Sequence, residues 1–181
     1  MDLLRAAAGG DTSAFHTLVD RHAGYLYRLA SYISRGSPDA EDIVQETLAG
    51  AFTGMKRFDG RASVKTWLTR ILMQQASRAW RKSKRRRAAD IDAAVTGESG
   101  ESMDAALCVQ SGSTAVDKKI DVAAVLEALN PEHREVLVLR EMQGMSYAQI
   151  AEVLAIPVGT VESRIHRARS EVRRRLQEYL P

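Results

Sequence analysis

Apolar residues recur at a helical period along most of the chain, and no convincing alternating strand pattern is present. The clearest segment is 146–176, which reads as two helices joined by a tight turn. Ser146 is suited to cap the first helix, because its hydroxyl can accept from an amide in the first turn. Pro157 and Gly159 then interrupt the period, since proline disfavours a helical residue before it and glycine permits unusual backbone angles. The pattern predicts a helix-turn-helix.

The second helix of this segment has an apolar stripe with intervals of four, three, four and four residues: Val161, Ile165, Ala168, Val172 and Leu176. Its opposite face is mostly basic and carries Glu162, Ser163, His166, Arg167, Arg169, Arg173, Arg174 and Arg175. A basic helix behind a helix-turn signature is typical of a recognition helix in the major groove of DNA. A helical hairpin with a solvated charged face is the alternative at this point, because charge runs are usually solvated.

Further helices are predicted upstream. They are a short helix over 2–8, a long helix capped by Thr12 or Ser13, a helix that begins at 37–41, and a helix over about 63–84. Downstream, helix is predicted to resume at about Asp117 and again after Asn130. With few aromatic residues and many Ala, Leu, Arg and Glu, the sequence indicates an all-α protein.

The helix that begins at 37–41 has an acidic and amide-bearing face. This face contains Asp39, Asp42, Gln45, Glu46 and Ala49. It is either a solvated surface or a docking surface for a basic partner.

The helix over about 63–84 combines an apolar stripe with a polar, basic face. The stripe contains Val64, Trp67, Leu68, Ile71, Leu72 and Ala79, and the opposite face contains Arg70, Gln74, Arg78 and Arg81. Trp67 by itself is most simply a core residue. Arginine and amide groups beside an indole are, however, also what single-stranded nucleic acid requires, because bases stack on aromatic rings and phosphates pair with arginine.

The charge of the chain is small in total but strongly segregated. The net charge is +3, yet residues 78–87 hold seven Lys and Arg, whereas 88–116 hold five Asp and Glu and no Lys or Arg. Helical periodicity also fails in 88–116, and its glycines and polar residues predict a flexible acidic linker. The 181 residues suffice for one ordinary domain or two small ones.

The single cysteine, Cys108, excludes an internal disulfide and a cysteine-based zinc site within one chain. One cysteine suits a reducing cytosol. No apolar run approaches membrane-spanning length and the N-terminus lacks a signal-peptide pattern, so we expect a cytoplasmic protein. No histidine and acid pattern indicates a metal, and we expect no cofactor.

Several motifs in a fixed order resemble the bacterial sigma factors of the extracytoplasmic-function (ECF) group, group 4 of the sigma-70 family. They are DAEDIVQE at 39–46, FDG at 58–60, TWL at 66–68, RI at 70–71, LNPE at 129–132, LRE at 139–141, GMSYAQIA at 144–151 and PVGTVESRIHRAR at 157–169. Each motif alone is moderately specific, and the ordered set is highly specific.

The resemblance implies two small helical domains joined by a flexible linker. Region 2 would occupy 1–87, the linker 88–116, and region 4, with the helix-turn-helix, 117–181. It also implies partners: core RNA polymerase, promoter DNA and an anti-sigma factor linked to the membrane, with no small-molecule substrate. The acidic linker fits a segment threaded through a basic channel built for nucleic acid.

The resemblance further implies three sets of binding residues. Polymerase would be bound by Asp39, Asp42, Gln45 and Glu46. The minus-10 promoter element would be recognised and melted by Arg61, Ser63, Lys65, Trp67, Arg70, Gln74, Arg78 and Arg81. The minus-35 element would be read by Thr160, Glu162, Ser163, Arg164, His166, Arg167 and Arg169.

Two other functions compete with a transcription initiation factor. A stand-alone helix-turn-helix regulator is the alternative, but it needs neither the acidic docking helix nor the aromatic and basic helix within 37–87. An enzyme such as a small nuclease lacks support, because the carboxylates lie at exposed helical spacings or in the linker. We therefore expect a factor without catalytic residues. The resemblance further implies that an anti-sigma partner holds it inactive until a stress signal arrives.

Overall fold

The computed structural model describes residues 2–34, 39–95 and 122–177, and over these ranges the secondary structure is helical with no strand. The elements are α1 (Asp2–Ala8), α2 (Thr12–Ile33), α3 (Asp39–Gly54), the 3-10 turn η1 (Met55–Arg57), α4 (Val64–Val95), α5 (Val122–Glu127), α6 (Pro131–Leu137), the π-helical turn η2 (Val138–Met142), α7 (Tyr147–Leu154) and α8 (Val158–Gln177). The predicted all-α fold is confirmed.

Helices α1 to α4 form an N-terminal bundle in which α2 packs on α1 and α3, and α3 packs on α4. Its core contains Leu18, Leu26, Leu29, Ile43, Leu68 and Leu72, all of which are buried. The apolar stripes predicted for these helices meet here, because burial of one apolar face is what holds an amphipathic helix in place.

The cap of α2 differs from the prediction. Asp11, rather than Thr12 or Ser13, is the N-cap, and its Oδ1 accepts from the amides of Ser13 at 2.9 Å and Ala14 at 3.1 Å. A carboxylate at this position also interacts favourably with the positive end of the helix dipole, which a hydroxyl cannot do. The helix therefore begins at Thr12.

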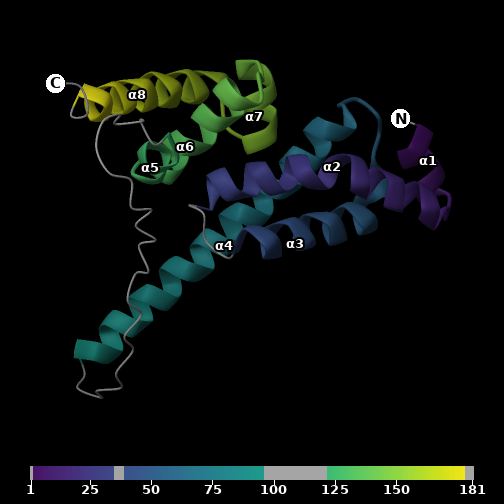
Figure 1. Ribbon diagram of the computed structural model, residues 1–181, viewed down its shortest axis with the longest axis horizontal. Coiled ribbons are helices and arrows are strands. Elements are labelled where there is room, and N and C mark those ends of the chain that lie inside the picture. Colours follow the sequence, from purple (N-terminus) through teal and green to yellow (C-terminus); the bar gives the residue numbers. More distant parts are fainter. Residues whose placement is uncertain (1, 35–38, 96–121, 178–181) are drawn as a thin grey trace, which may run out of the picture.

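Helix α4 is longer than predicted. It ends at Val95 rather than near Lys84, and its last turns include 88–95, the start of the segment predicted as linker. Residues 88–95 include four alanines, the strongest helix former, and the first glycine comes only at Gly97. The end of α4 projects away from the rest of the molecule (Figure 1). The remainder of the predicted linker, with Cys108, lies outside the described residues.

The C-terminal helices confirm the predicted helix-turn-helix, formed by α7 and α8. Ser146 caps α7 in a reciprocal arrangement: its Oγ accepts from the Gln149 amide at 3.2 Å, and its own amide donates to Gln149 Oε1 at 2.8 Å. Helix α7 ends at Leu154, and its C-cap Ala155 has a left-handed backbone with φ of 54°. Ile150 and Val153 of α7 and Val161 of α8 are buried in the core of this part.

The two groups of helices lie against each other. Helix α7 packs on α4, while α5, α6 and η2 contact α2. In Figure 1 the C-terminal helices cover one side of the N-terminal bundle. Within the described ranges, no helix has the length and apolar character needed to cross a membrane.

Candidate functional site

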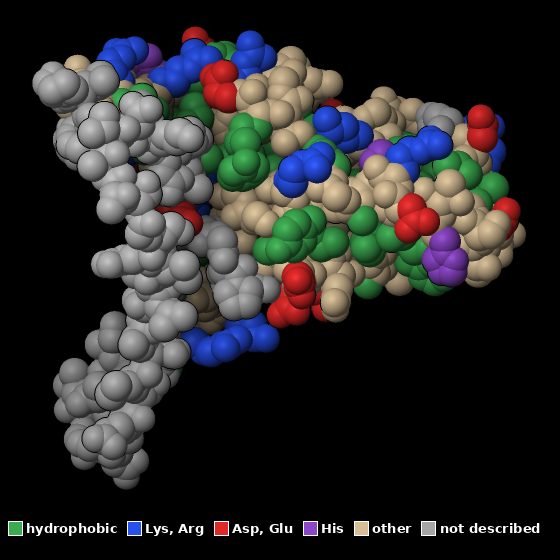
Figure 2. All heavy atoms as spheres, in the orientation of Figure 1, with side chains coloured by type: hydrophobic (Ala, Val, Ile, Leu, Met, Phe, Trp, Pro, Cys, Tyr) green, Lys and Arg blue, Asp and Glu red, His purple; other side chains and the backbone are tan. Residues whose placement is uncertain are grey.

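Helix α8 presents a polar face because its apolar stripe is fixed in the core. Val161, Ile165 and Ala168 are at most 1% exposed, so the helix cannot rotate without exposing them. The residues between them, Glu162, Ser163, His166 and Arg167, are exposed. Figure 2 shows Lys and Arg side chains gathered along α8 at the upper edge of the molecule. All four lie in the first turns of the helix, which is the part that reaches base edges in a helix-turn-helix.

The remaining minus-35 candidates are placed differently. Arg164 is half-buried, and its guanidinium lies 2.7 Å from the Glu132 carboxylate of α6. Arg169 pairs with Glu141 at 2.6 Å, and both of these side chains are about half exposed. Thr160 is half-buried at the start of α8. The ion pairs tie α8 to the helices beneath it, and a DNA contact by Arg164 or Arg169 stays a prediction.

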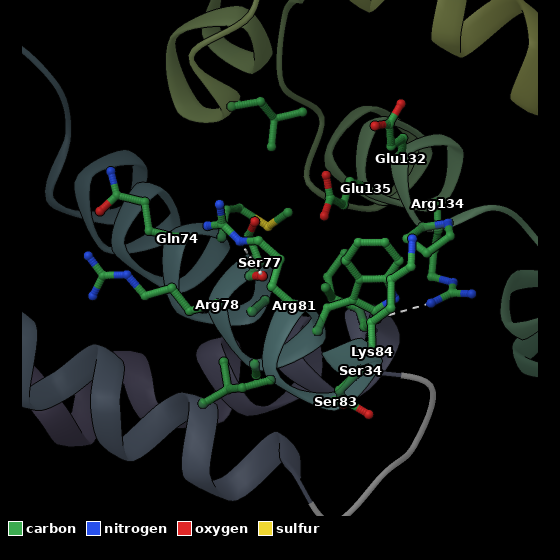
Figure 3. A pocket seen from close by; sticks show the side chains of 18 of the residues that line it. Ser34, Gln74, Ser77, Arg78, Arg81, Ser83, Lys84, Glu132, Arg134 and Glu135 are labelled. Atoms are coloured by element: carbon green, nitrogen blue, oxygen red, sulfur yellow. Dashed lines mark hydrogen bonds between the residues drawn. The ribbon is translucent and has the colours of Figure 1, made fainter. Parts of the chain in front are cut away.

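The predicted face of α4 is present, with Gln74, Arg78 and Arg81 exposed along it. These residues line one wall of a hollow of about 1190 Å³, and α6 and α7 form the opposite wall. Figure 3 shows Glu132 and Glu135 across the hollow from α4. Arg70 lies on the same face of α4 and is paired with Glu152 of α7.

Residues near the start of α4 have local structural roles. Ser63 Oγ accepts from the Thr66 amide at 3.0 Å, Arg61 pairs with Asp59 at 3.3 Å, and the Lys65 amine lies 4.6 Å from the centre of the Tyr25 ring. Arg61, Ser63 and Lys65 are nevertheless exposed, so they can still meet a ligand.

Trp67 is half-buried at the edge of the bundle core. Its ring centre lies 5.1 Å from that of Phe58, and its six-membered ring lies beside Gly54, where an added Cβ would be in ordinary van der Waals contact with it. This contact fixes the loop before α4 against the end of α3. The indole therefore has a packing role, whether or not it also meets DNA.

The acidic face of α3 is exposed as predicted. Asp42, Gln45 and Glu46 point to solvent, whereas Ile43 and Val44 are buried. Asp39 is the first residue of α3, and its side chain lies outside what the structure describes. Three neighbouring polar side chains within about one helical turn can engage one basic surface.

Sequence reasoning missed Arg134, a charged residue that is only 2% exposed. Its guanidinium donates to the carbonyl oxygens of Leu126 at 2.7 Å, Glu127 at 2.9 Å, Leu129 at 2.9 Å and Ile33 at 3.1 Å. The signal in the sequence is its position three residues before Leu137 and four before Val138, on the apolar stripe of α6. A basic residue in an apolar stripe needs buried acceptors.

Sequence reasoning also missed Glu135, which lines the hollow between α4 and α6. Burial raises the pKa of its carboxyl from the ordinary 4.5 to about 7; the neighbouring Glu132 adds to the rise, while Arg164 and Arg134 oppose it. Among the described residues, no group of three or more His, Cys, Asp and Glu is arranged to hold a metal ion.

Comparison with known families identifies both halves of the chain. A family model described as Sigma-70 region 2 matches residues 18–86, and one described as Sigma-70, region 4 matches residues 119–172.

Full-length relatives give the same result. The chain is 33% identical over 180 residues to the ECF RNA polymerase sigma-E factor of Escherichia coli (strain K12). This match covers 97% of this chain and 93% of that protein. It is 34% identical over 175 residues to the ECF RNA polymerase sigma factor SigM of Mycobacterium tuberculosis (strain ATCC 35801 / TMC 107 / Erdman), covering 97% of this chain and 83% of that protein.

Solved structures are similar over nearly the whole length. CnrH, in complex with the cytosolic domain of CnrY, matches with a TM-score of 0.67 and 31% identity, over 97% of this chain and 96% of that chain. The sigma factor RpoE of Bartonella quintana, in complex with the anti-sigma factor NepR, matches with a TM-score of 0.66 and 26% identity, over 90% of this chain and 96% of that chain. The chain therefore belongs to the ECF sigma factors of the sigma-70 family.

Proposed function

We propose that this sigma factor binds core RNA polymerase through α3, recognises and melts the minus-10 element with α4 and the loop before it, and reads the minus-35 element with α8. The observation that carries the last assignment is the burial of Val161, Ile165 and Ala168, which turns Glu162, Ser163, His166 and Arg167 outward. The exposed acid and amide groups of α3 and the exposed cations of α4 support the other two assignments.

These functions are assigned to two proposed domains. Region 2, at 1–87, binds polymerase and the minus-10 element, and region 4, at 117–181, binds the minus-35 element. The proposed linker is 88–116, and its first turns continue α4. The protein supplies binding surfaces, and the polymerase supplies the chemistry. It needs no cofactor and no small-molecule substrate, and it acts in the cytoplasm, where its polymerase partner and promoters are.

An anti-sigma factor is proposed as its regulator. Support comes from the relatives CnrH and RpoE, which were solved with the cytosolic domain of CnrY and with the anti-sigma factor NepR. The regulator of this protein would be linked to the membrane and release it on a stress signal.

Pull-down with purified core polymerase tests the proposal against the stand-alone regulator. The protein should co-purify with core polymerase at near-equal stoichiometry and bind promoter DNA tightly only as part of that complex. A protein that binds its DNA tightly alone and leaves core polymerase in the flow-through would be a stand-alone helix-turn-helix regulator.

A further inference from the structure

Arg70 of α4 is held by a residue of the other half of the chain. Its guanidinium donates to the carboxylate of Glu152 on α7, which lies 82 positions further along the sequence. The two side chains are 37% and 52% exposed, so water and other ions can reach the pair. Arg70 lies on the α4 face assigned above to minus-10 DNA. The Glu152 carboxylate therefore pairs with a guanidinium that a DNA phosphate could also bind, because both anions pair with guanidinium.

A second contact between the halves lies at the end of α2. Helix α2 ends at Ile33, whose carbonyl oxygen accepts from Arg134 of α6 at 3.1 Å. The last carbonyls of a helix have no partner within it and attract positive charge. Because Arg134 also caps the end of α5, one buried guanidinium joins α2 to the C-terminal helices.

The packing of the C-terminal helices on the N-terminal bundle, called the closed arrangement from here on, also covers part of the α4 face. Gln74 and Arg81 line the hollow whose other wall includes Glu135, Val153 and Leu154. A DNA strand approaching these residues would meet α6 and α7. The α4 face is thus obstructed in two ways: Arg70 is paired with Glu152, and the neighbouring Gln74 and Arg81 are partly covered by α6 and α7.

Geometry prevents a closed chain from reading both promoter elements. The minus-35 and minus-10 elements are centred about 25 base pairs apart, and at about 3.4 Å per base pair this separation is about 85 Å along the duplex. From Glu152 to Thr160 the chain can span at most about 29 Å, and from Thr160 to Arg167 along α8 about 10 Å. With Arg70 in contact with Glu152, the candidate reading residues of α4 and α8 are therefore far too close together.

We propose that the pair of Arg70 and Glu152 is an autoinhibitory contact, in which Glu152 takes the place of a DNA phosphate until polymerase separates the two halves of the chain. The proposal rests on the proposed role of Arg70 in minus-10 binding. An exposed ion pair is weak by itself and is weakened further by salt, so it can be exchanged for DNA without a large barrier. The contact at Ile33 supplies a second attachment, and opening breaks both.

Single-molecule energy transfer between dyes on the full-length free protein tests the closed contact. The dyes are placed at Thr53→Cys of α3 and Ser170→Cys of α8, two exposed positions, in a Cys108→Ser background. Wild type should show a dominant high-transfer population. Glu152→Gln and Arg70→Gln should each lower the ratio of closed to open molecules by up to about fivefold, and the exchanged pair Arg70→Glu with Glu152→Arg should restore it. Asp20→Asn, which removes an exposed acid of α2 far from the contact in sequence, is the matched control and should change nothing.

Promoter opening by the holoenzyme separates this proposal from the assignment of Arg70 to DNA. On a promoter selected from genomic DNA by the wild-type holoenzyme, Glu152→Gln should open promoters at the wild-type rate, whereas the exchanged pair should stay defective although it closes. Transfer histograms unchanged by both single variants would overturn the closed contact and leave the DNA assignment intact. If Arg70→Gln opens promoters at the wild-type rate, Arg70 does not bind minus-10 DNA. Glu152 then does not compete with DNA for Arg70, and the autoinhibitory proposal is overturned as well.

Discussion

Arg134 and Ile33, which are 101 positions apart, are joined by a hydrogen bond of 3.1 Å from the guanidinium to the carbonyl oxygen. The same guanidinium serves three carbonyls at and after the end of α5. A buried charge satisfied by main-chain carbonyls cannot be replaced by an apolar side chain without leaving those oxygens unpaired.

Arg134→Met should therefore lower the free energy of unfolding by about 3 kcal/mol, since each buried unpaired polar group costs about 1–3 kcal/mol. Arg134→Lys should lose less, because an amine keeps the charge and some of the hydrogen bonds. Urea denaturation followed by circular dichroism measures both. Arg173→Met, at an exposed position of α8, is the control and should stay within about 0.5 kcal/mol of wild type. A comparably small change in Arg134→Met would contradict the role given to Arg134.

Glu135 should make stability depend on pH. Its pKa is raised from the ordinary 4.5 to about 7, mainly by burial, so the folded protein holds a proton that the unfolded chain releases between these values. The stabilisation is fully present below about pH 4.5 and is lost as the pH rises toward 7. The charged groups around it are Glu132 and Arg134 of α6 and Arg164 of α8, and Arg81 and Lys84 of α4 line the same hollow.

Glu135→Gln should thus raise stability at pH 8 by about 1–2 kcal/mol relative to wild type, a figure discounted for partial exposure, and should leave it nearly unchanged at pH 4.5. The difference between variant and wild type, measured by urea denaturation across this range, cancels the titration of other groups. Glu127→Gln, at an exposed position of α5, should show no such trend. If the difference in unfolding free energy between Glu135→Gln and wild type does not change with pH, the Glu135 carboxyl is charged in the folded protein at neutral pH.

The α3 face should control polymerase binding. Asp42→Arg combined with Glu46→Arg reverses two exposed charges and should abolish binding to core polymerase, while the circular dichroism spectrum stays native. Asp20→Arg on the exposed face of α2 is the control for added positive charge and should bind as wild type does. Affinity measured by fluorescence anisotropy decides the question; unchanged binding by the folded double variant would remove α3 from the interface.

Within α8, base reading and phosphate binding should separate along the helix. Arg167→Ala should relax the preference at one or two minus-35 base pairs, because arginine discriminates guanine by about 1–3 kcal/mol. Arg173→Ala, two turns further along, should weaken all sequences alike and lower the salt slope by about one unit if it neutralises one phosphate. Binding of holoenzyme to a set of promoter variants at several salt concentrations measures both. Uniform weakening by Arg167→Ala would mean that Arg167 is a phosphate contact.

The sequence was sufficient for features that depend on local patterns. The stripe of Val161, Ile165 and Ala168, the cap at Ser146 and the exposed face of Asp42 and Glu46 follow from helical periodicity and capping chemistry, and the structure confirms them. The start of α2 was missed because Asp11, Thr12 and Ser13 are all capable caps and only geometry decides among them. The C-cap of α7 carried no glycine to mark the left-handed backbone of Ala155.

Contacts between distant segments could not be predicted in the same way. Arg134 and Glu135 are adjacent in sequence, yet one is satisfied by carbonyls of α2 and α5 and the other lines the hollow beside α4. Likewise, Arg70 has the same spacing as Gln74 and Arg78, and nothing in the helical period indicates that Glu152 will pair with it. Such pairings depend on how the halves pack, which no local pattern encodes.

Initiation by a reconstituted holoenzyme tests the account most directly. Core polymerase alone and core polymerase with this protein are given fragmented genomic DNA, and the 5′ ends of the transcripts are mapped by sequencing. The account predicts a limited set of new start sites that share upstream minus-10 and minus-35 sequences, and loss of those sites with Asp42→Arg plus Glu46→Arg. Transcripts from core polymerase that start at the same positions with and without the protein would contradict it.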